Sequence, residues 1–351
     1  MNIKEQIDLY SDYLIATPGK ATAIGLSEML EYQVSHDKIT RLLASGMLDS
    51  KALWHAAKPL CYDIKSPDAV LIIDDSILEK PSTDVSELVN YHYDHSKNRE
   101  VKGVNFLTSL YLSKDFSVPV GVELVKKDTK GINKKGKEYD KSSVTKNVLF
   151  RQLVERAWYN GVDFGYVLCD SWFATVENKE LIVKKCKNNF VIVLKSNRLV
   201  ALTLEDRKAG KWVRIDSLEL ENRTQLAYLK GLDIPVLLTS QVFENKEESV
   251  GVNYLVTNEL SLSFAEITTI YKKRWKVETY HQSVKQHTAM GKSPTQTVTT
   301  QTSHFIAALL AYIKLERLKT RYDKSHHFLK NFVYESNPTD LQPITTYEPT
   351  P

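Results

Sequence analysis

Two short apolar runs that end in aspartate place the strongest constraint on the fold of this chain. Residues 69–73 read Ala-Val-Leu-Ile-Ile and lead into Asp74 and Asp75, while residues 166–169 read Tyr-Val-Leu-Cys and lead into Asp170. Such short apolar runs, bounded by polar residues, are typical of buried strands. The sequence therefore predicts a sheet with at least two buried strands, each followed by a carboxylate.

Helical patterns alternate with these strands, which predicts a mixed α/β sheet with helices packed on it. In chain order, the expected elements are strands over 69–73, 104–112 and 117–125, a helix over 148–158, a strand over 166–169, a helix over 178–187 and a strand over 189–194. Short links join the first three strands, so we expect these strands to pair antiparallel. Residues 126–146 are rich in lysine and include glycines, which indicates a polar loop.

Different patterns flank this region on both sides. Residues 1–65 are helical in periodicity, and the short patterns over 22–32 and 35–45 resemble a helix-turn-helix. Contact with DNA and simple packing of a helical hairpin on the main domain are equally compatible with so short a pattern. Strand-like runs separated by polar turns indicate a β-rich insertion over 198–262; they span 212–215, 224–229, 234–239 and 251–257.

Two long helices are expected after the insertion, over 263–287 and 301–321. The tail after Tyr334 is rich in proline and poor in apolar residues, so we expect it to be disordered. The resulting division is a helical region over 1–65, a first core segment over 66–197, the β-rich insertion over 198–262, a second core segment over 263–325 and a tail over 326–351.

Composition and charge exclude several classes of protein. The chain has 351 residues, of which 42% are hydrophobic and 26% charged, which is ordinary for a globular protein and excludes disordered and fibrous classes. We expect neither a membrane-spanning segment nor a secretory signal. The three cysteines lack CxxC spacing, which disfavours a disulfide framework or a structural zinc and fits a reducing cytoplasm. A net charge of +4 permits nucleic-acid binding without requiring it.

The aspartates at the strand ends are candidate catalytic groups. In sheets with helical crossovers, functional side chains gather where the strands end. Asp74 or Asp75 would then lie near Asp170. The alternative is that these aspartates are turn or capping residues, which is the commoner role at such positions.

The expected helix over 263–287 carries a second group of candidate residues. Tyr271, Arg274, Glu278 and Lys285 are separated by three, four and seven residues. At about 100° per residue, they lie within roughly 60° of one another around the helix axis. One face of the helix would thus combine a carboxylate with a phenol and two cations. The alternative is a solvent-exposed face stabilised by an Arg274–Glu278 pair.

The pattern Tyr-x2-Arg-x3-Glu-x6-Lys at 271–285 resembles the signature of the bacterial insertion-sequence transposases of the DDE class. Ile-Asp-Asp-Ser at 73–76 resembles the first-acid motif of that class, and Cys-Asp-Ser-Trp-Phe at 169–173 resembles its second-acid motif. The order of the motifs and the β-rich insertion before the last one also match. The resemblance covers residues 66–325.

This resemblance implies an RNase H-like mixed sheet with flanking helices, an all-β insertion before the last catalytic helix and a helical N-terminal region that binds DNA. It implies Asp74, Asp170 and Glu278 as catalytic and metal-binding residues, and Tyr271, Arg274 and Lys285 as DNA-binding residues. The implied cofactor is a pair of Mg²⁺ ions, for which Mn²⁺ can substitute; carboxylate oxygens suit Mg²⁺, and two such ions can serve phosphodiester chemistry. Asp75 stays open as an alternative first acid.

The resemblance also implies an activity and partners. The activity would be binding of terminal inverted repeats, cleavage of the DNA at the ends of the element and joining of those ends to target DNA. The protein would act as a homodimer on double-stranded DNA, in the cytoplasm near the nucleoid of a prokaryote and away from membranes.

Two rival functions are an RNase H-like DNA endonuclease that does not join strands and a catalytically silent DNA-binding protein derived from a transposase. The β-rich insertion and the Tyr-Arg-Glu-Lys face argue against the first, and the presence of all three acids argues against the second. His92 and His95 suggest a metal cluster, but their spacing suits a loop, which disfavours metal binding. The lysines of 126–146 fit DNA-backbone contact and a solvated loop equally.

Overall fold

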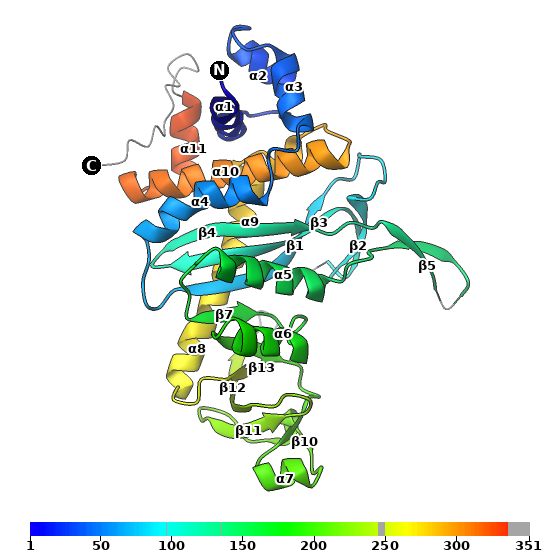
Figure 1. Ribbon diagram of the computed structural model, residues 1–351, viewed down its shortest axis with the longest axis vertical. Coiled ribbons are helices and arrows are strands. Elements are labelled where there is room, and N and C mark those ends of the chain that lie inside the picture. The colour runs from blue at the N-terminus through cyan, green and yellow to red at the C-terminus, as the bar shows by residue number, and fades with distance from the viewer. Residues whose placement is uncertain (96, 134, 245–249, 336–351) are drawn as a thin grey trace.

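The computed structural model describes residues 1–95, 97–133, 135–244 and 250–335 of the chain. Within these residues, eleven strands form one long mixed sheet (Figure 1). Its central strand β1 (Val70–Glu79) pairs antiparallel with β3 (Arg99–Ser113) and parallel with β7 (Tyr166–Cys169), which in turn pairs parallel with β8 (Asn189–Leu194). The predicted mixed α/β sheet is confirmed, and the buried runs before Asp74 and Asp170 form neighbouring strands. The first strand was expected to end at residue 73, but β1 continues to Glu79, so Asp74 and Asp75 lie within the strand and not at its end.

The insertion, predicted to be all-β, is rich in strands that extend the main sheet, but it also contains the short helix α7 (Leu204–Lys208). β13 (Val250–Thr257) pairs with β8, and β12 (Pro235–Glu244) pairs with β13. The sheet then continues through β11 (Gln225–Leu229) and β9 (Leu199–Ala201) to β10 (Val213–Arg214). The short helix α7 (Leu204–Lys208) lies at this end of the molecule (Figure 1). One continuous sheet therefore connects the insertion to the strands that carry the aspartates.

The opposite end of the sheet is formed by β2 (Val89–Asp94) and β4 (Phe116–Leu124), which pair with β3. The lysine-rich segment 126–146, predicted to be a loop, contains a hairpin of β5 (Thr129–Ile132) and β6 (Glu138–Lys141) that projects from the body (Figure 1). Its turn depends on Gly136, which has a φ of 75°, and on Asn133, whose Oδ1 accepts from two backbone N–H groups. The loop prediction was wrong because neither strand of the hairpin buries a residue, so the segment lacks the alternation of apolar and polar residues by which a strand is predicted.

The N-terminal helices pack around one long apolar helix near the C-terminus. These are α1 (Ile3–Ala16), α2 (Ala23–Met29), α3 (His36–Ala44) and α4 (Ser50–Asp63), and the long helix is α10 (Val298–Tyr322). Lys314 Nζ on α10 donates to Asp12 Oδ1 on α1 at 2.8 Å, and Tyr10 hydroxyl lies 2.9 Å from His304 Nδ1. Because these groups are buried, α1 is held to α10 by specific polar contacts as well as by apolar packing.

The tail was expected over 326–351 and to be largely disordered, with the proline-rich part after Tyr334, and its first part forms helix α11 (His326–Glu335). α11 packs on α1, α9 and α10, so the chain is helical up to the point where the disorder was expected. Residues 336–351 lie outside the described residues. No helix among the residues that the structure describes is long and apolar enough to cross a membrane.

Two sets of helices cover the central strands. In the view of Figure 1, the helices in front of the sheet are α5 (Lys146–Tyr159) and α6 (Val176–Glu180), which continues into a π-helical turn, Leu181–Lys185. Helix α9 (Lys276–His287) passes behind the sheet. The helix predicted over 263–287 is interrupted: α8 (Phe264–Lys272) is joined to α9 by a 3₁₀ turn, Lys273–Trp275. This break changes the direction in which the side chains around Arg274 point.

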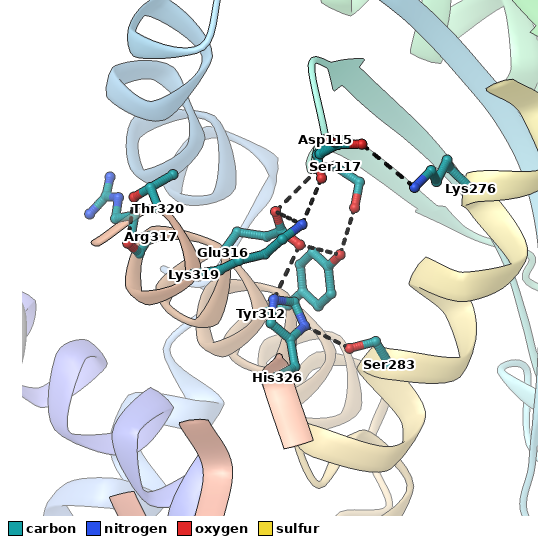
Figure 2. Close-up of polar contacts among 10 residues, drawn as sticks. All are labelled: Asp115, Ser117, Lys276, Ser283, Tyr312, Glu316, Arg317, Lys319, Thr320 and His326. Atoms are coloured by element: carbon teal, nitrogen blue, oxygen red, sulfur yellow. Dashed lines mark hydrogen bonds and ion pairs between the residues drawn. The ribbon is translucent and has the colours of Figure 1, made fainter. Parts of the chain in front are cut away.

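A buried polar network holds the outer side of α9 (Figure 2). Ser283 Oγ on α9 lies 2.8 Å from His326 Nδ1 on α11, and His326 Nε2 lies 3.2 Å from Glu316 Oε1 on α10. The Tyr312 hydroxyl donates to the same Glu316 oxygen at 3.0 Å and lies 2.7 Å from Ser117 Oγ at the start of β4. Because each link joins a different element, the network fixes α9 relative to the sheet.

Candidate functional site

Asp74 and Asp170 lie side by side because of the register of their strands. Ile72 of β1 pairs with Leu168 of β7 in a parallel arrangement; Asp74 is two residues further along β1, and Asp170 directly follows the last residue of β7. Side chains two residues apart in a strand point to the same face. Asp74 therefore lies beside the point where β7 ends and Asp170 follows, and the two carboxylates interact electrostatically.

Asp74 is buried, with 8% of its surface exposed, and its carboxylate meets a cation from the helix behind the sheet. Arg274 Nη1 donates to Asp74 Oδ2 at 3.2 Å and lies 3.9 Å from Glu278 Oε1. The guanidinium thus stands between the first and third candidate acids. This contact links the middle of β1 to the 3₁₀ turn that precedes α9.

The Arg274 side chain is only 12% exposed, so it does not lie on a solvated helix face. Its guanidinium lies 5.9 Å from the ring centre of Tyr271 and 5.1 Å from that of Trp275, within cation–π range. Tyr271 is itself buried, with 5% exposed, and burial raises the pKa of its hydroxyl. The structure therefore places Tyr271 beneath Arg274, as a support for the guanidinium.

Asp170 directly follows β7 and begins a tight turn. Its Oδ1 accepts from the backbone N–H of Trp172 at 2.9 Å and from that of Phe173 at 3.4 Å. Burial raises the pKa of Asp170, these N–H groups oppose that rise, and the nearby Asp75 carboxylate adds to it. The same side chain thus shapes the turn and presents a partly buried carboxylate, so the turn-residue role and a catalytic role coexist here.

Asp75 has different partners from Asp74, because adjacent residues of a strand point to opposite faces. Its Oδ2 accepts from Lys146 Nζ at 2.6 Å, at the beginning of α5, and from Asn105 Nδ2 at 2.9 Å on β3. Asp75 is therefore already neutralised on the α5 side of the sheet, whereas Asp74 faces α9.

Glu278 and Lys285 lie one and three turns along α9 from Arg274 and have contrasting environments. The Glu278 side chain is 55% exposed, and its Oε1 lies 3.9 Å from Arg274 Nη1. Lys285 is partly buried; its Nζ donates to Ser76 Oγ at 2.7 Å and to the carbonyl of Ile77 at 3.0 Å. Burial lowers the pKa of Lys285. Lys285 therefore attaches α9 to β1, and the interpretation of this stripe as a solvent-exposed face is wrong.

Electrostatics at the site favour the binding of a cation. Burial raises the pKa of Asp74 to about 8, against the opposing effect of Arg274. The neighbouring carboxylates of Asp170, Asp75 and Glu278 raise it further. Burial outweighs the 3.2 Å ion pair here, since one guanidinium is shared between two acids and cannot compensate for three nearby carboxylates. A cluster of acids that repel one another in this way is stabilised by added positive charge.

The donor atoms of these residues fit a hard divalent cation, because Asp74, Asp170 and Glu278 supply only carboxylate oxygens. Within the part of the chain that the structure describes, however, no three His, Cys, Asp or Glu side chains are grouped closely enough to hold a metal ion as they stand. The space between Asp74 and Glu278 is taken by the Arg274 guanidinium. The oxygen ligands and negative charge of these acids thus suit a divalent cation. In this arrangement the Arg274 guanidinium is the cation that Asp74 and Glu278 share.

Sequence reasoning missed two residues that contribute to this site. Ser76 accepts from Lys285 and so attaches the third motif to the first. Lys146 neutralises Asp75 and so distinguishes the two adjacent acids. Ser76 could have been found from the motif at 73–76, whereas the pairing of Lys146 depends on a contact between residues 71 positions apart.

Comparison with known proteins agrees with this geometry. A family model described as DDE superfamily endonuclease matches residues 3–211, more than half of the chain, and includes Asp74 and Asp170. A comparison with curated proteins finds no match. The chain belongs to the DDE superfamily of endonucleases.

Proposed function

We propose that this protein is a DNA transposase that binds the terminal inverted repeats of an insertion sequence, cleaves the DNA at the ends of the element and joins them to target DNA. The observation that carries the proposal is that Asp74 in β1 interacts electrostatically with Asp170, which follows the adjacent parallel strand β7, while Arg274 contacts both Asp74 and Glu278. The first and third motifs, 200 residues apart in sequence, are thus joined by a direct contact.

Asp74, Asp170 and Glu278 would hold two Mg²⁺ ions, with Mn²⁺ as a substitute, and Asp75 is disfavoured as the first acid because Lys146 and Asn105 already engage it. When bound, such ions activate the attacking oxygen and stabilise the leaving oxygen of a phosphodiester. Nucleases of this superfamily generally depend on divalent metals, which supports this assignment.

The chain's own cations would position the DNA. Arg274 can form bidentate hydrogen bonds to a phosphate once it releases the acids, because a guanidinium matches phosphate geometry. Tyr271 would act through Arg274, since its ring lies below the guanidinium. Lys285 would keep α9, and therefore Glu278, at the right distance from β1.

The protein would work as a homodimer in the cytoplasm, since two ends of one element must be held together for joining. This assembly and its location are part of the proposal. The helical region formed by α1–α4 would contribute contacts to DNA beyond the cleaved end.

The test is a joining assay with purified protein, Mg²⁺ and a duplex that carries the inverted repeats flanking the gene. We expect cleavage at the ends of the repeats, followed by covalent insertion into a supercoiled target. Cleavage without joining would favour the rival endonuclease, and binding without cleavage would favour the silent DNA-binding protein. A duplex with scrambled end sequences is the matched control.

A further inference from the structure

A cavity of about 450 Å³ opens beside the turn that follows Asp170. It lies between that turn, the beginning of α6, the link from β8 to β9 and the end of β11. Its volume is within the range of about 300–1,000 Å³ that is typical of sites for small ligands. The candidate active site and this cavity therefore adjoin along the chain, since Ser171 and Trp172 line the cavity.

The lining of the cavity is strongly cationic. Lys179, Lys195, Arg198 and Lys230 line it, and no carboxylate is among the described residues of the lining. Lys179 is buried and donates to backbone carbonyls of the turn, and burial lowers its pKa to about 8, so the exposed cations supply most of the charge of the lining. The Lys195, Arg198 and Lys230 side chains are exposed, and within the described residues they take part in no ion pair. A concave site with this balance of charge favours a phosphate-bearing ligand.

Exposed aromatic rings form a row that leads to the cavity. Trp172 is 50% exposed and Tyr93, on β2, is 49% exposed. The ring of His95 lies between them, with ring centres 6.2 Å from Trp172 and 4.9 Å from Tyr93. Lys195 Nζ lies 5.8 Å from the ring centre of Trp172. Aromatic rings beside cations are the combination that binds single-stranded nucleic acid, through base stacking and phosphate contacts.

The row is tied directly to the second candidate acid. The backbone N–H of Trp172 donates to Asp170 Oδ1, so the ring and the carboxylate are fixed by the same turn. Paired bases in a duplex are stacked on each other, and their faces are not accessible to a side chain. Only an unpaired strand can therefore use both the rings and the cationic cavity.

We propose that the cavity and the aromatic row Tyr93–His95–Trp172 form a binding site for single-stranded DNA, which receives the unpaired nucleotides next to the phosphodiester held at Asp170. The proposal rests on the function proposed above for its biological meaning, but the binding itself requires no cleavage. Trp172 would stack on a base, and Lys195 and Arg198 would contact its flanking phosphates.

The test measures binding of a fluorescently labelled oligothymidine to the full chain, without metal, by anisotropy. We expect Trp172→Ala to weaken binding by about tenfold, the size typical of one lost base stack, and Trp172→Phe to restore most of it. Trp158→Ala, which removes another partly exposed tryptophan, is the matched control and should change nothing.

Charge is tested with the double variant Lys195→Ala, Arg198→Ala. It should lower the slope of log affinity against log salt by about 1.4, since each phosphate contact on a single strand contributes about 0.7. The control is the double variant Lys208→Ala, Lys211→Ala. It removes two exposed lysines of the β-rich insertion that do not line the cavity. Melting temperatures of all variants establish that they are folded.

The outcomes separate this proposal from the one above. Oligothymidine affinity that is equal in the wild type, Trp172→Ala and the Lys195/Arg198 double variant overturns the single-strand site, whatever the cleavage assay shows. Absence of cleavage by the wild type, combined with a loss of oligothymidine binding in these variants, overturns the transposase proposal and supports the site. A preference for blunt duplex over oligothymidine that depends on Trp172 also overturns the single-strand site.

Discussion

Asp74 and Asp75 are neighbours in sequence with opposite surroundings, and this difference can be measured. Asp74 faces Arg274 and Asp170, whereas Asp75 is paired with Lys146. If Asp74 is a metal ligand, Mg²⁺ should raise the melting temperature of the wild type and of Asp75→Asn, but not that of Asp74→Asn, because a bound ion stabilises the folded state. Thermal shifts with and without Mg²⁺ check this.

The same measurement has a predicted pH dependence. The pKa of Asp74 is raised to about 8, so below that pH a proton must leave before a metal can bind. The shift caused by Mg²⁺ should therefore grow as the pH rises through about 8. A shift that is equally large in Asp74→Asn, or larger in it than in Asp75→Asn, would contradict the choice of Asp74.

His304 gives a prediction about stability and pH that is independent of catalysis. Burial lowers its pKa from 6.5 to about 4, and its Nε2 lies 3.2 Å from the carbonyls of Ala289 and Met290. Because the unfolded chain takes up the proton first as the pH falls, this group stabilises the folded state above about pH 6.5. That stability is lost between about pH 6.5 and pH 4, by roughly 3 kcal/mol at most.

We expect His304→Gln to be less stable than the wild type at neutral pH and to lose less stability across that interval. Urea unfolding at several pH values measures both quantities, with His36→Gln as the control because His36 is exposed. Parallel curves for the wild type and His304→Gln would show that His304 is protonated in the folded state as easily as in the unfolded one.

At the level of elements, α9 is held to β1 by Lys285 and to Asp74 by Arg274, and the two contacts should have different effects. Lys285→Ala removes two hydrogen bonds from a charged donor, so it should cost about 2–4 kcal/mol of stability and reduce cleavage by displacing Glu278. Arg274→Ala relieves the acids of their shared cation and removes a phosphate contact, so affinity for DNA ends should fall by about 1–3 kcal/mol.

Melting temperature and end affinity measured on the same variants check this pair of predictions. Lys276→Ala is the control on the same helix, since its side chain is more than half exposed. Unchanged end affinity in Arg274→Ala would mean that its contact with Asp74 is purely structural.

The sequence was most informative where chemistry and periodicity coincide. The apolar runs before Asp74 and Asp170 predicted two buried strands of one sheet, and the spacing of Arg274, Glu278 and Lys285 predicted one shared face. The burial of Tyr271 and Arg274 was not predictable, because it depends on the 3₁₀ turn that interrupts the expected single helix. Helical periodicity gives the face of a straight helix, and a local change of hydrogen bonding rotates every residue beyond it.

Elements whose pattern is purely polar were the least predictable. The β5–β6 hairpin has no buried face, so neither of its strands shows alternation of apolar and polar residues. Likewise, the role of Lys146 depends on a distant partner. Secondary structure is predicted from the periodicity of apolar residues, so a segment that buries no apolar face gives little signal.

At the scale of the whole molecule, the N-terminal helices and the C-terminal helix α10 share one core. Lys314 is 6% exposed and pairs with Asp12, at opposite ends of the sequence. We expect Lys314→Met to destabilise the entire chain by about 3 kcal/mol, because it leaves a buried carboxylate without its partner. Urea unfolding followed by fluorescence and by circular dichroism should show a single transition, shifted to lower urea for both probes.

Lys4→Met, on the exposed side of α1, is the control for this variant. Two separate transitions in Lys314→Met, with the later one unchanged from the wild type, would show that the N-terminal helices fold apart from the catalytic sheet.

The central claim is that Asp74, Asp170 and Glu278 form one metal-dependent cleavage site. Its most direct test is the cleavage of DNA carrying the element's ends by purified Asp170→Asn in the presence of Mg²⁺, with end affinity measured on the same preparation. We expect cleavage to be lost and end affinity to be retained, because the amide is a poor metal ligand while the phosphate contacts from lysine and arginine persist. Cleavage by Asp170→Asn at the rate of the wild type would contradict the assignment.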